Sequence, residues 1–306
     1  MISDWSQNIH AYLDRSENHR PVKTSFEFFP PNNEPMENLF WESIQRLQGL
    51  NPEFMSVTHG AGGTGRNRTD ATLVQLMRKK VPGVAAHLTC SGSTKDETRN
   101  IIDRYSQLGI NHIVALRGDR LRNSKPKTKI DGFTNAVELV SEIAQREHFE
   151  ISVAGYPELH PDARNFNEEI AYLKAKVEAG ADRIITQFFF DNTAFYRFRD
   201  KAVNAGIDAP IVPGLLPVMN FESVVRFARR CHSQIPQWYF NVFERYGTTE
   251  VEPGLSIAIL AEQCFDLREN GVNEFHFYTL NRHHIVEPVC RLLNPVSQRD
   301  ITRKTG

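Results

Sequence analysis

The chain has 306 residues, with 36 basic and 37 acidic side chains and a formal net charge of −1 when histidine is neutral. This balance argues against the strongly basic surface that nucleic-acid binding needs, so we expect no nucleic-acid partner. The four cysteines are scattered without a CxxC pair, which is typical of a reducing compartment and disfavours a disulfide framework or a thiolate zinc site.

Residues 1–22 are polar, and we interpret them as a partly helical lead-in to a single domain over residues 23–306. They lack the apolar core of a signal peptide, and no later run is long and apolar enough to span a membrane. We therefore expect a soluble cytoplasmic protein that does not bind membranes.

The first predicted strand, Thr24–Phe29, lies in the segment SFEFFPP. Side chains alternate along a strand, so Phe26 and Phe28 share one face while Ser25 and Glu27 share the other. A carboxylate buried among aromatic rings needs either a raised pKa or a polar partner. The alternative is an edge strand with Glu27 in water, and these seven residues leave both interpretations open.

Apolar runs and amphipathic segments then alternate along the chain. We predict further strands over Glu53–Thr58, Val84–Thr89, His112–Leu116, Glu150–Gly155, Arg183–Phe190, Ile211–Leu215 and Glu274–Tyr278. We predict helices over Met36–Leu50, Asp70–Lys80, Lys95–Leu108, Asn135–Arg146, Glu168–Ala179, Thr193–Ala205, Phe221–Arg230 and Glu252–Glu269, with a final helix after Arg282.

Eight strands, each followed by helix, predict a parallel sheet covered by helices and favour an α/β fold, a (β/α)8 TIM barrel forming a single domain. Such barrels run to ~250 residues or more as one domain. An open doubly wound sheet is the alternative.

Polar residues gather where the predicted strands end, which is where a barrel builds its active site. They are Glu27, Thr58, His59, His87, Arg117, Asp119, Tyr156, His160, Gln187 and Arg282. The pattern predicts a site for a polar, multi-ring ligand.

Two common site patterns are disfavoured. Gly60–Gly65 fits G-x-G-x-x-G, but it is the second strand–helix turn, and the next strand ends at His87-Leu88-Thr89 without the acid that a dinucleotide fingerprint requires. The histidines show no zinc-ligand spacing, so we expect no metal site.

The segments SFEFFPP, VTHGA, HLTC, LRGD, GYPELHP, ITQFFFD, PGLLP and HFYTLNR occur in this order from Ser25 to Arg282. Together they strongly resemble the bacterial 5,10-methylenetetrahydrofolate reductases, over nearly the whole chain. The resemblance implies a flavoprotein barrel with FAD as cofactor and NADH or NADPH as co-substrate. It also implies reduction of 5,10-methylenetetrahydrofolate to 5-methyltetrahydrofolate by a ping-pong hydride transfer, which feeds methionine synthesis and one-carbon metabolism.

The resemblance also assigns residues. Glu27 corresponds to the general acid, and Asp119 to the residue near the flavin that also binds the pterin. Other substrate-binding positions are Gln187, Phe227 and Arg282. Positions that contact FAD or NADH are Thr58, His59, Ala61, His87, Arg117, Gly118, Asp119, Tyr156, His160, Ala163, Glu169 and Lys176.

Some positions depart from the relatives. They are His59 in place of Tyr, Glu169 in place of Asp, Ser223 in place of Gln, Phe133 in place of Tyr and Ala175 in place of Arg. These departures bear on individual cofactor contacts and on nucleotide preference, which the sequence leaves open.

Three other functions are alternatives from the sequence, although Glu27, Gln187 and the segment HFYTLNR argue against the second of them. They are a barrel that binds folate or flavin without catalysis, a flavin oxidoreductase of another substrate such as proline dehydrogenase, and a one-carbon transfer enzyme. Relatives are often homo-oligomers, so a homo-oligomer is expected by analogy. The chain length also leads us to expect no regulatory domain after the barrel, unlike in the eukaryotic members.

Overall fold

Short parallel strands form the centre of the molecule. The structure, a computed structural model, describes residues 21–59, 66–118, 131–247 and 252–294. Its strands are β1 (Lys23–Phe28), β2 (Phe54–Val57), β3 (Val84–Thr89), β4 (His112–Leu116), β5 (Glu150–Gly155), β6 (Arg183–Thr186), β7 (Ile211–Val212), β8 (Gly214–Leu215) and β9 (Glu274–Tyr278).

The strands close into a barrel. Their order in the sheet is β7-β6-β5-β4-β3-β2-β1-β9-β8, and every pairing is parallel. The two outermost strands in this order, β7 and β8, are separated in the chain only by Pro213. The (β/α)8 barrel is therefore confirmed, and the doubly wound alternative is wrong.

The predicted strand Ile211–Leu215 is one element in the sequence but two in the structure. Its first part pairs with β6 and its second with β9, so this short stretch bridges the two sides of the barrel. Pro213 has no N–H to donate, which suits a break between ladders, and its carbonyl accepts from the His276 N–H at 3.0 Å.

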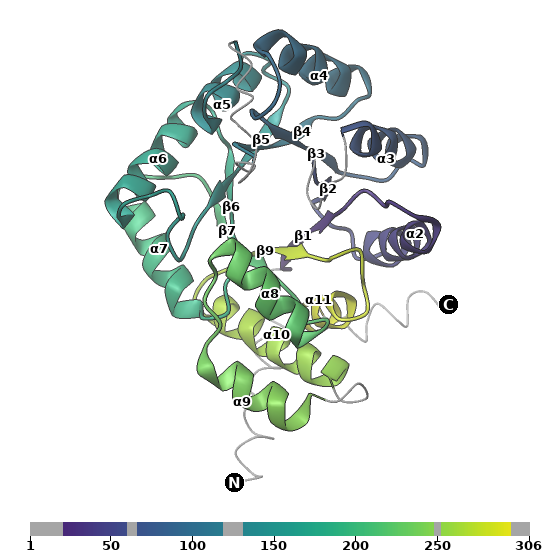
Figure 1. Cartoon of the computed structure of the whole chain (residues 1–306), viewed down its shortest axis with the longest axis vertical. Helices are drawn as coiled ribbons and strands as arrows, with labels where there is room; N and C mark the ends of the chain where they lie inside the picture. The colour runs from purple at the N-terminus through teal and green to yellow at the C-terminus, as the bar shows by residue number, and fades with distance from the viewer. Residues whose placement is uncertain (1–20, 60–65, 119–130, 248–251, 295–306) are drawn as a thin grey trace.

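Helices surround the strands (Figure 1). They are α2 (Glu34–Gln48), α3 (Arg66–Arg78), α4 (Lys95–Gln107), α5 (Ala136–Ala144), α6 (Phe166–Glu178), α7 (Asn192–Asn204), α8 (Phe221–Cys231), α9 (Gln237–Tyr246), α10 (Glu252–Glu269) and α11 (Val286–Leu293).

The helix α9 was not predicted. Its sequence, QWYFNVFERY, is rich in aromatic residues with modest helix propensity, and no side chain caps its start at Pro236. It forms because Tyr239 and Phe243 pack into a separate apolar cluster with α8. In Figure 1, α9 lies outside the ring of helices, next to α10.

The aromatic face of β1 belongs to the main core between strands and helices. Phe26 and Phe28 are fully buried, and Phe28 meets Phe40 of α2 edge to face at 5.6 Å. The interior of the barrel has a small apolar layer of Phe54, Ala85 and Ile185.

Charged residues gather at the amino-terminal ends of the strands. Arg183 pairs with Glu150 on the neighbouring strand and, at 3.0 Å, with Glu274. Lys23 pairs with Glu53 at 3.1 Å at the same end. The opposite face, at the carboxyl-terminal ends of the strands, is the one on which barrels of this class bind their ligands.

The proposed lead-in lies mostly outside the described residues. Val22 is buried, and its backbone N–H and C=O both bond to the Asn294 side chain, at 2.8 and 2.7 Å. Across the described ranges, no helix is both long and apolar enough to cross a membrane.

Candidate active site

Strand β1 directs Glu27 into the barrel. Its partners in register are Ser56 on β2 and Tyr278 on β9, so β1 has a neighbour on both sides. The Glu27 side chain is 14% exposed, whereas Phe26 and Phe28 face the helices. The predicted alternation is confirmed, and the edge-strand interpretation of Glu27 is wrong.

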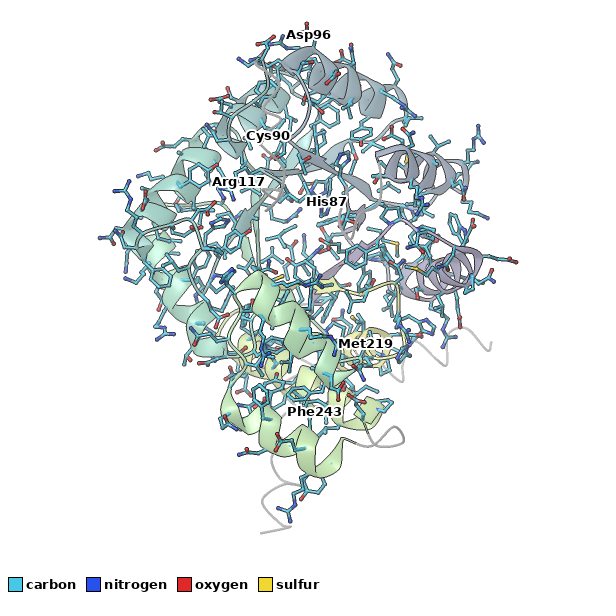
Figure 2. All side chains as sticks on the ribbon, viewed as in Figure 1. His87, Cys90, Asp96, Arg117, Met219 and Phe243 are labelled. Carbon is cyan, nitrogen blue, oxygen red and sulfur yellow. The ribbon has the colours of Figure 1, made fainter. Side chains whose placement is uncertain are left out.

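The Glu27 carboxylate lies next to two imidazoles. Its Oε2 is 3.4 Å from Nε2 of His87 and 3.9 Å from Nε2 of His276. Burial lowers the pKa of His87 to about 4, although the charge of Glu27 opposes this shift. His87 is therefore neutral near pH 7, and its contact with Glu27 is a polar contact rather than an ion pair. Figure 2 shows His87 inside the ring of strands.

Histidines and serines from neighbouring strands fill the interior around Glu27. Ser25 Oγ lies 2.8 Å from His276 Nδ1, and Ser56 Oγ lies 3.3 Å from His87 Nε2. A third pair, Ser152 Oγ and His112 Nε2, is separated by 2.8 Å. Sequence reasoning did not assign these serines or His112. The sequence did carry a signal that could have found them, because alternation along the strands puts each of them on the inward face.

Strand β2 contributes a buried hydroxyl at its end. Thr58 donates its N–H to the Phe28 carbonyl at 2.9 Å, and its own carbonyl accepts from Thr69 Oγ1 at 3.0 Å. The side-chain Oγ1 of Thr58 is buried and finds no hydrogen-bond partner within the described part of the chain. A buried hydroxyl without a partner is a position that a bound ligand can satisfy. The neighbouring His59 is half-buried.

The turn after β4 is held by the preceding loop. The Arg117 carbonyl accepts from Cys90 Sγ at 3.1 Å and from Ser91 Oγ at 2.5 Å. Gly118 has φ +86°, and a Cβ there would lie 2.7 Å from Ser91 Oγ, so the turn requires glycine. The Arg117 guanidinium pairs with Asp162 at 2.7 Å, which joins the turn to the loop after β5.

The loop after β5 and the helix α6 supply further predicted cofactor residues. The rings of Tyr156 and His160 meet edge to face at 4.5 Å, and Ala163 donates its N–H to the His160 carbonyl. Glu169 and Lys176 on α6 are both buried.

Burial changes the pKa values of this pair in opposite directions. It raises the pKa of Glu169 and lowers that of Lys176 to about 8, and the opposite charge of the other residue counteracts each shift. Lys176 Nζ donates to the Ala154 carbonyl near the end of β5 at 2.5 Å.

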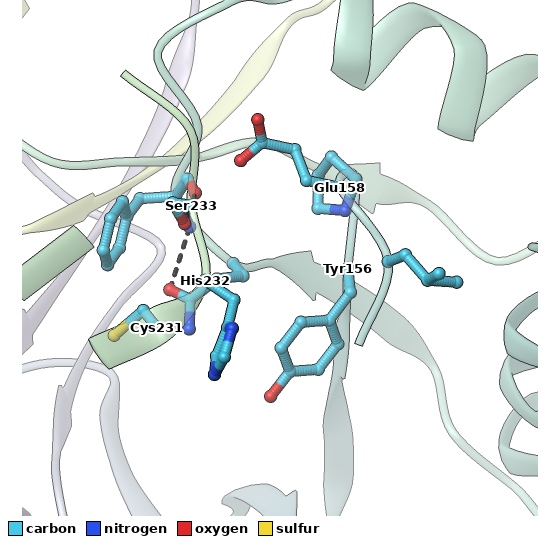
Figure 3. A pocket seen from close by; sticks show the side chains of 9 residues that line it. Tyr156, Glu158, Cys231, His232 and Ser233 are labelled. Carbon is cyan, nitrogen blue, oxygen red and sulfur yellow. Dashed lines mark hydrogen bonds between the residues drawn. The ribbon is translucent and has the colours of Figure 1, made fainter. Parts of the chain in front are cut away.

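Gln187 and Phe227 lie at the next part of the rim. Phe227 of α8 stacks on Phe188, with ring centroids 5.2 Å apart. Gln187 Oε1 accepts from the Phe188 N–H at 3.0 Å. A small pocket lies here, between the ends of β5 and β6 and the end of α8. Its lining residues are Tyr156, Pro157, Glu158, Leu159, Gln187, Phe188, Cys231, His232 and Ser233 (Figure 3).

Two members of this pocket, Cys231 and His232, carried no signal in the sequence. His232 is the left-handed residue that ends α8, with φ 59°. Glu158, although part of GYPELHP, was not assigned a role. Its carboxylate accepts from the Gln234 N–H at 3.0 Å, and burial raises its pKa.

Arg282 follows β9 and has an exposed side chain, and its N–H donates to the Thr279 carbonyl at 2.9 Å. Beside it, the Tyr278 hydroxyl donates to the Thr186 carbonyl at 2.8 Å. The structure thus places the described predicted residues at the carboxyl ends of the strands and on the adjoining loops and helices. Ala61 and Asp119 lie outside the described residues.

Two further positions that depart from the relatives, Phe133 and Ser223, make contacts of their own. Phe133 is buried, with Lys95 Nζ 5.7 Å from its ring centre. Ser223 lies in the first turn of α8, where its N–H donates to Asn220 Oδ1 and its Oγ accepts from Arg226. In the part of the chain that the structure describes, no group of three or more histidine, cysteine or acidic side chains is arranged to hold a metal ion.

The fold is a (β/α)8 barrel, and polar side chains gather at the carboxyl ends of its strands. A family model described as methylenetetrahydrofolate reductase matches residues 12–294. The chain belongs to the methylenetetrahydrofolate reductase family.

Named relatives agree with this placement. The chain is 43% identical over 274 residues to 5,10-methylenetetrahydrofolate reductase from Salmonella typhimurium, covering 89% of this chain and 90% of that protein. The Escherichia coli protein of the same description gives the same identity and coverage. Methylenetetrahydrofolate reductase (NADH) 1 of Arabidopsis thaliana is 34% identical over 293 residues, and the match spans 49% of its length.

A solved structure supports the fold. A protein from Clostridium thermocellum, described as uncharacterized and as binding two copies of 5-methyl-5,6,7,8-tetrahydrofolic acid, aligns with a TM-score of 0.62 at 16% identity. The alignment covers 96% of this chain and 99% of that one. At this identity the likeness concerns the fold alone.

Proposed function

We propose that the protein reduces 5,10-methylenetetrahydrofolate to 5-methyltetrahydrofolate, with FAD as its cofactor and NADH or NADPH as the electron donor. The observation that carries the proposal is Glu27, a carboxyl group that points into the barrel from the end of β1. Family membership supports the same reaction. Location in the cytoplasm and assembly into a homo-oligomer stay predictions.

The reaction needs a proton at N10 of the folate, and Glu27 is suited to deliver it. Transfer of the proton from the carboxyl group weakens the bond between N10 and the bridging methylene. When that bond breaks, an iminium remains at N5, and addition of a hydride converts it to the methyl group. FAD, when bound, supplies this hydride after receiving one from the nicotinamide. The low exposure of the Glu27 side chain limits its contact with bulk water.

Other residues of the rim suit the remaining parts of the folate. Phe227 offers an aromatic face at the mouth of the site, stacked on Phe188. Gln187 brings a side-chain amide that can both donate and accept hydrogen bonds. The exposed Arg282 guanidinium can pair with a carboxylate of the glutamyl tail.

The residues around the rim also fit a flavin nucleotide. The Thr58 hydroxyl is buried and lacks a partner among the described residues, so a ligand atom can satisfy it. Arg117 and Lys176 add positive charge that suits a diphosphate, although Arg117 already pairs with Asp162. We propose that these residues hold FAD together with His87, Tyr156, His160 and Glu169, and that Ala61 and Asp119 contribute from outside the described residues.

The first experiment is single-turnover spectroscopy of the purified protein without oxygen. We expect a yellow protein whose flavin absorbance is lost on adding NADH or NADPH and returns on adding methylenetetrahydrofolate. A protein that binds folate or flavin without catalysis would not complete this cycle, and a flavin oxidoreductase of another substrate would complete only the first half.

A variant of Glu27 tests its role as the acid. Glu27→Gln keeps the size and polarity of the side chain but removes the proton donor, so folate reduction should fall by about 10²-fold or more. Oxidation of NADH by an artificial acceptor such as menadione should be retained.

Glu53→Gln is the matched control, because Glu53 precedes β2 at the opposite end of the barrel and pairs with Lys23. Near wild-type folate reduction by Glu27→Gln would show that Glu27 is not the acid.

A further inference from the structure

Beyond its last residue, β1 is bound by one side chain. The Phe29 N–H donates to Asn281 Oδ1 at 2.8 Å, and Asn281 Nδ2 donates to the Phe29 carbonyl at 2.8 Å. The buried amide of Asn281 thus forms the two hydrogen bonds that a further strand residue would form. Pro30 follows directly and has no N–H with which to extend the ladder.

Thr279 holds the neighbouring residue, Glu27, by its backbone. Both the Thr279 N–H and its Oγ1 donate to the Glu27 carbonyl, at 3.2 and 2.6 Å. Thr279 Oγ1 also accepts from the Asn281 N–H at 3.1 Å, and the Thr279 carbonyl accepts from the Arg282 N–H at 2.9 Å. Thr279 is therefore bonded directly to both Glu27 and Arg282.

The backbone that carries these bonds is unusual. Leu280 and Asn281 both lie in the left-handed region, with φ 51° and 60°. Asparagine tolerates this region, but leucine does so at a cost, and such strain persists only where surrounding contacts enforce it. Ser43 of α2 provides one such contact, because its Oγ donates to the Asn281 carbonyl at 2.8 Å.

We propose that Thr279 and Asn281 are positioning residues. They fix the position of Glu27, the acid, relative to Arg282, the arginine that binds the substrate. This inference rests on the proposed function, in which Glu27 protonates the folate and Arg282 binds it. The hydrogen bonds of Thr279 and Asn281 fix the end of β1 to the turn after β9, which we call the β1–β9 clamp. Because Thr279 is bonded to both Glu27 and Arg282, the clamp holds these two residues at a fixed separation, and loosening the clamp releases that constraint.

Two substitutions of Asn281 separate the amide from the backbone conformation. Asn281→Gly keeps the left-handed conformation at little cost but removes both side-chain bonds to Phe29. Asn281→Asp keeps the shape of the side chain. It replaces the Nδ2 donor with a carboxylate oxygen, which then faces the Phe29 carbonyl oxygen. The matched control is Asn51→Gly, since Asn51 is also left-handed, with φ 52°, but is exposed and lies before β2 at the opposite end of the barrel.

The two half-reactions are then measured separately by stopped flow. In both Asn281 variants, oxidation of the reduced flavin by methylenetetrahydrofolate should slow by about tenfold or more, because small misplacements of reacting groups are costly. Reduction of the flavin by NADH should be unchanged. Hydrogen exchange, measured without substrate, should increase in a peptide covering 24–29 and not in one covering 84–89.

A double variant distinguishes a positioning role of Asn281 from a merely structural role. If Asn281 acts by placing Glu27, Asn281→Gly should cause little further loss in the Glu27→Gln background. Equal loss in both backgrounds, or an equal slowing of both half-reactions, would overturn the inference. Thr279→Val, which keeps the shape and removes the hydroxyl, is the second variant if those at Asn281 do not fold, with the same slowing of folate reduction expected.

The outcomes also separate this inference from the proposed function. If the wild-type flavin is not oxidised by methylenetetrahydrofolate, the proposed function is wrong and the inference is wrong with it. If the wild type reacts and the variants at Asn281 and Thr279 react equally fast, only the inference is wrong.

Discussion

At the scale of single residues, the interior of the barrel is organised by uncharged imidazoles. Burial and the positive charge of Arg183 lower the pKa of His112 to about 3, and burial lowers that of His87 to about 4. Each of these histidines lies within reach of a serine hydroxyl on the neighbouring strand. His87 is therefore an uncharged polar neighbour of the Glu27 carboxylate.

These lowered pKa values make stability depend on pH. In the unfolded chain a histidine takes up a proton below about pH 6.5, whereas in the folded chain His112 and His87 stay neutral down to about pH 3 and 4. The unfolded state binds more protons in this window, so the free energy of unfolding should fall by about 1.4 kcal/mol per pH unit for each such histidine as the pH drops below about 6.5.

Urea titrations at a series of pH values measure this slope. His112→Gln, which removes one of the two imidazoles and keeps a polar group near Ser152, should reduce the slope by the share of one histidine. An unchanged slope would show that His112 does not titrate as described.

The sequence predicted the position of some site residues but not which side chains lie beside them. The position of Glu27 followed from strand alternation, because its two-residue period is a local property. The imidazoles beside it come from β3 and β9, which are distant in the chain, so its neighbours depended on the order of the strands.

At the scale of elements, local signals predicted most helices well. The helix predicted to begin at Lys95 does so in the structure as α4, which starts with a full capping box at Thr94. Thr94 Oγ1 accepts from the Glu97 N–H at 3.1 Å, and Glu97 Oε2 accepts from the Thr94 N–H at 2.9 Å. By contrast, α9 lacks a side-chain cap and depends on packing, so local signals missed it.

The capping box provides a prediction about stability alone. Thr94→Ala removes one of its two bonds and should lower the free energy of unfolding by about 1 kcal/mol. Thr94→Ser keeps the hydroxyl and should cost much less. Both variants should keep wild-type folate reduction, because Thr94 lies at the start of an outer helix. Chemical denaturation of the three proteins checks this, and equal stability of all three would contradict the cap.

At the scale of the whole molecule, closure of the barrel depends on the region between β7 and β8. Gly214 donates its N–H to Thr186 Oγ1 at 2.9 Å, and the Tyr278 hydroxyl donates to the Thr186 carbonyl. A Cβ on Gly214 would lie 2.1 Å from the Thr186 carbonyl oxygen and 2.6 Å from the Tyr278 ring. The strands of the two sides therefore approach each other too closely here for any other residue.

Gly214→Ala should be strongly destabilising, because backbone would have to move to admit the methyl group. We expect a loss of about 2 kcal/mol or more in the free energy of unfolding, or failure to fold. The matched control is Gly254→Ala in α10, where a Cβ meets nothing within 4 Å. That control should be stabilising by about 0.5–1 kcal/mol through helix propensity. Wild-type stability of Gly214→Ala, read from thermal unfolding, would contradict this account of closure.

The sequence by itself determined the spacing of apolar residues within each strand and helix, and the order of these elements along the chain. Alternating strands and helices, with polar residues at the strand ends, favoured the barrel class and predicted the face for the site, because both depend on local patterns repeated along the chain. The order of the segments from SFEFFPP to HFYTLNR then gave the resemblance to the family. Local patterns also placed Glu27 on the inward face of β1.

Only the tertiary structure decided which groups meet. On either side of the break at Pro213, the chain pairs first with β6 and then with β9. The imidazoles of His87 and His276 lie beside Glu27. The amide of Asn281 completes the end of β1. Glu27 and Asn281 are separated by more than two hundred positions in the chain. Such contacts arise from closure of the sheet, which no local pattern encodes.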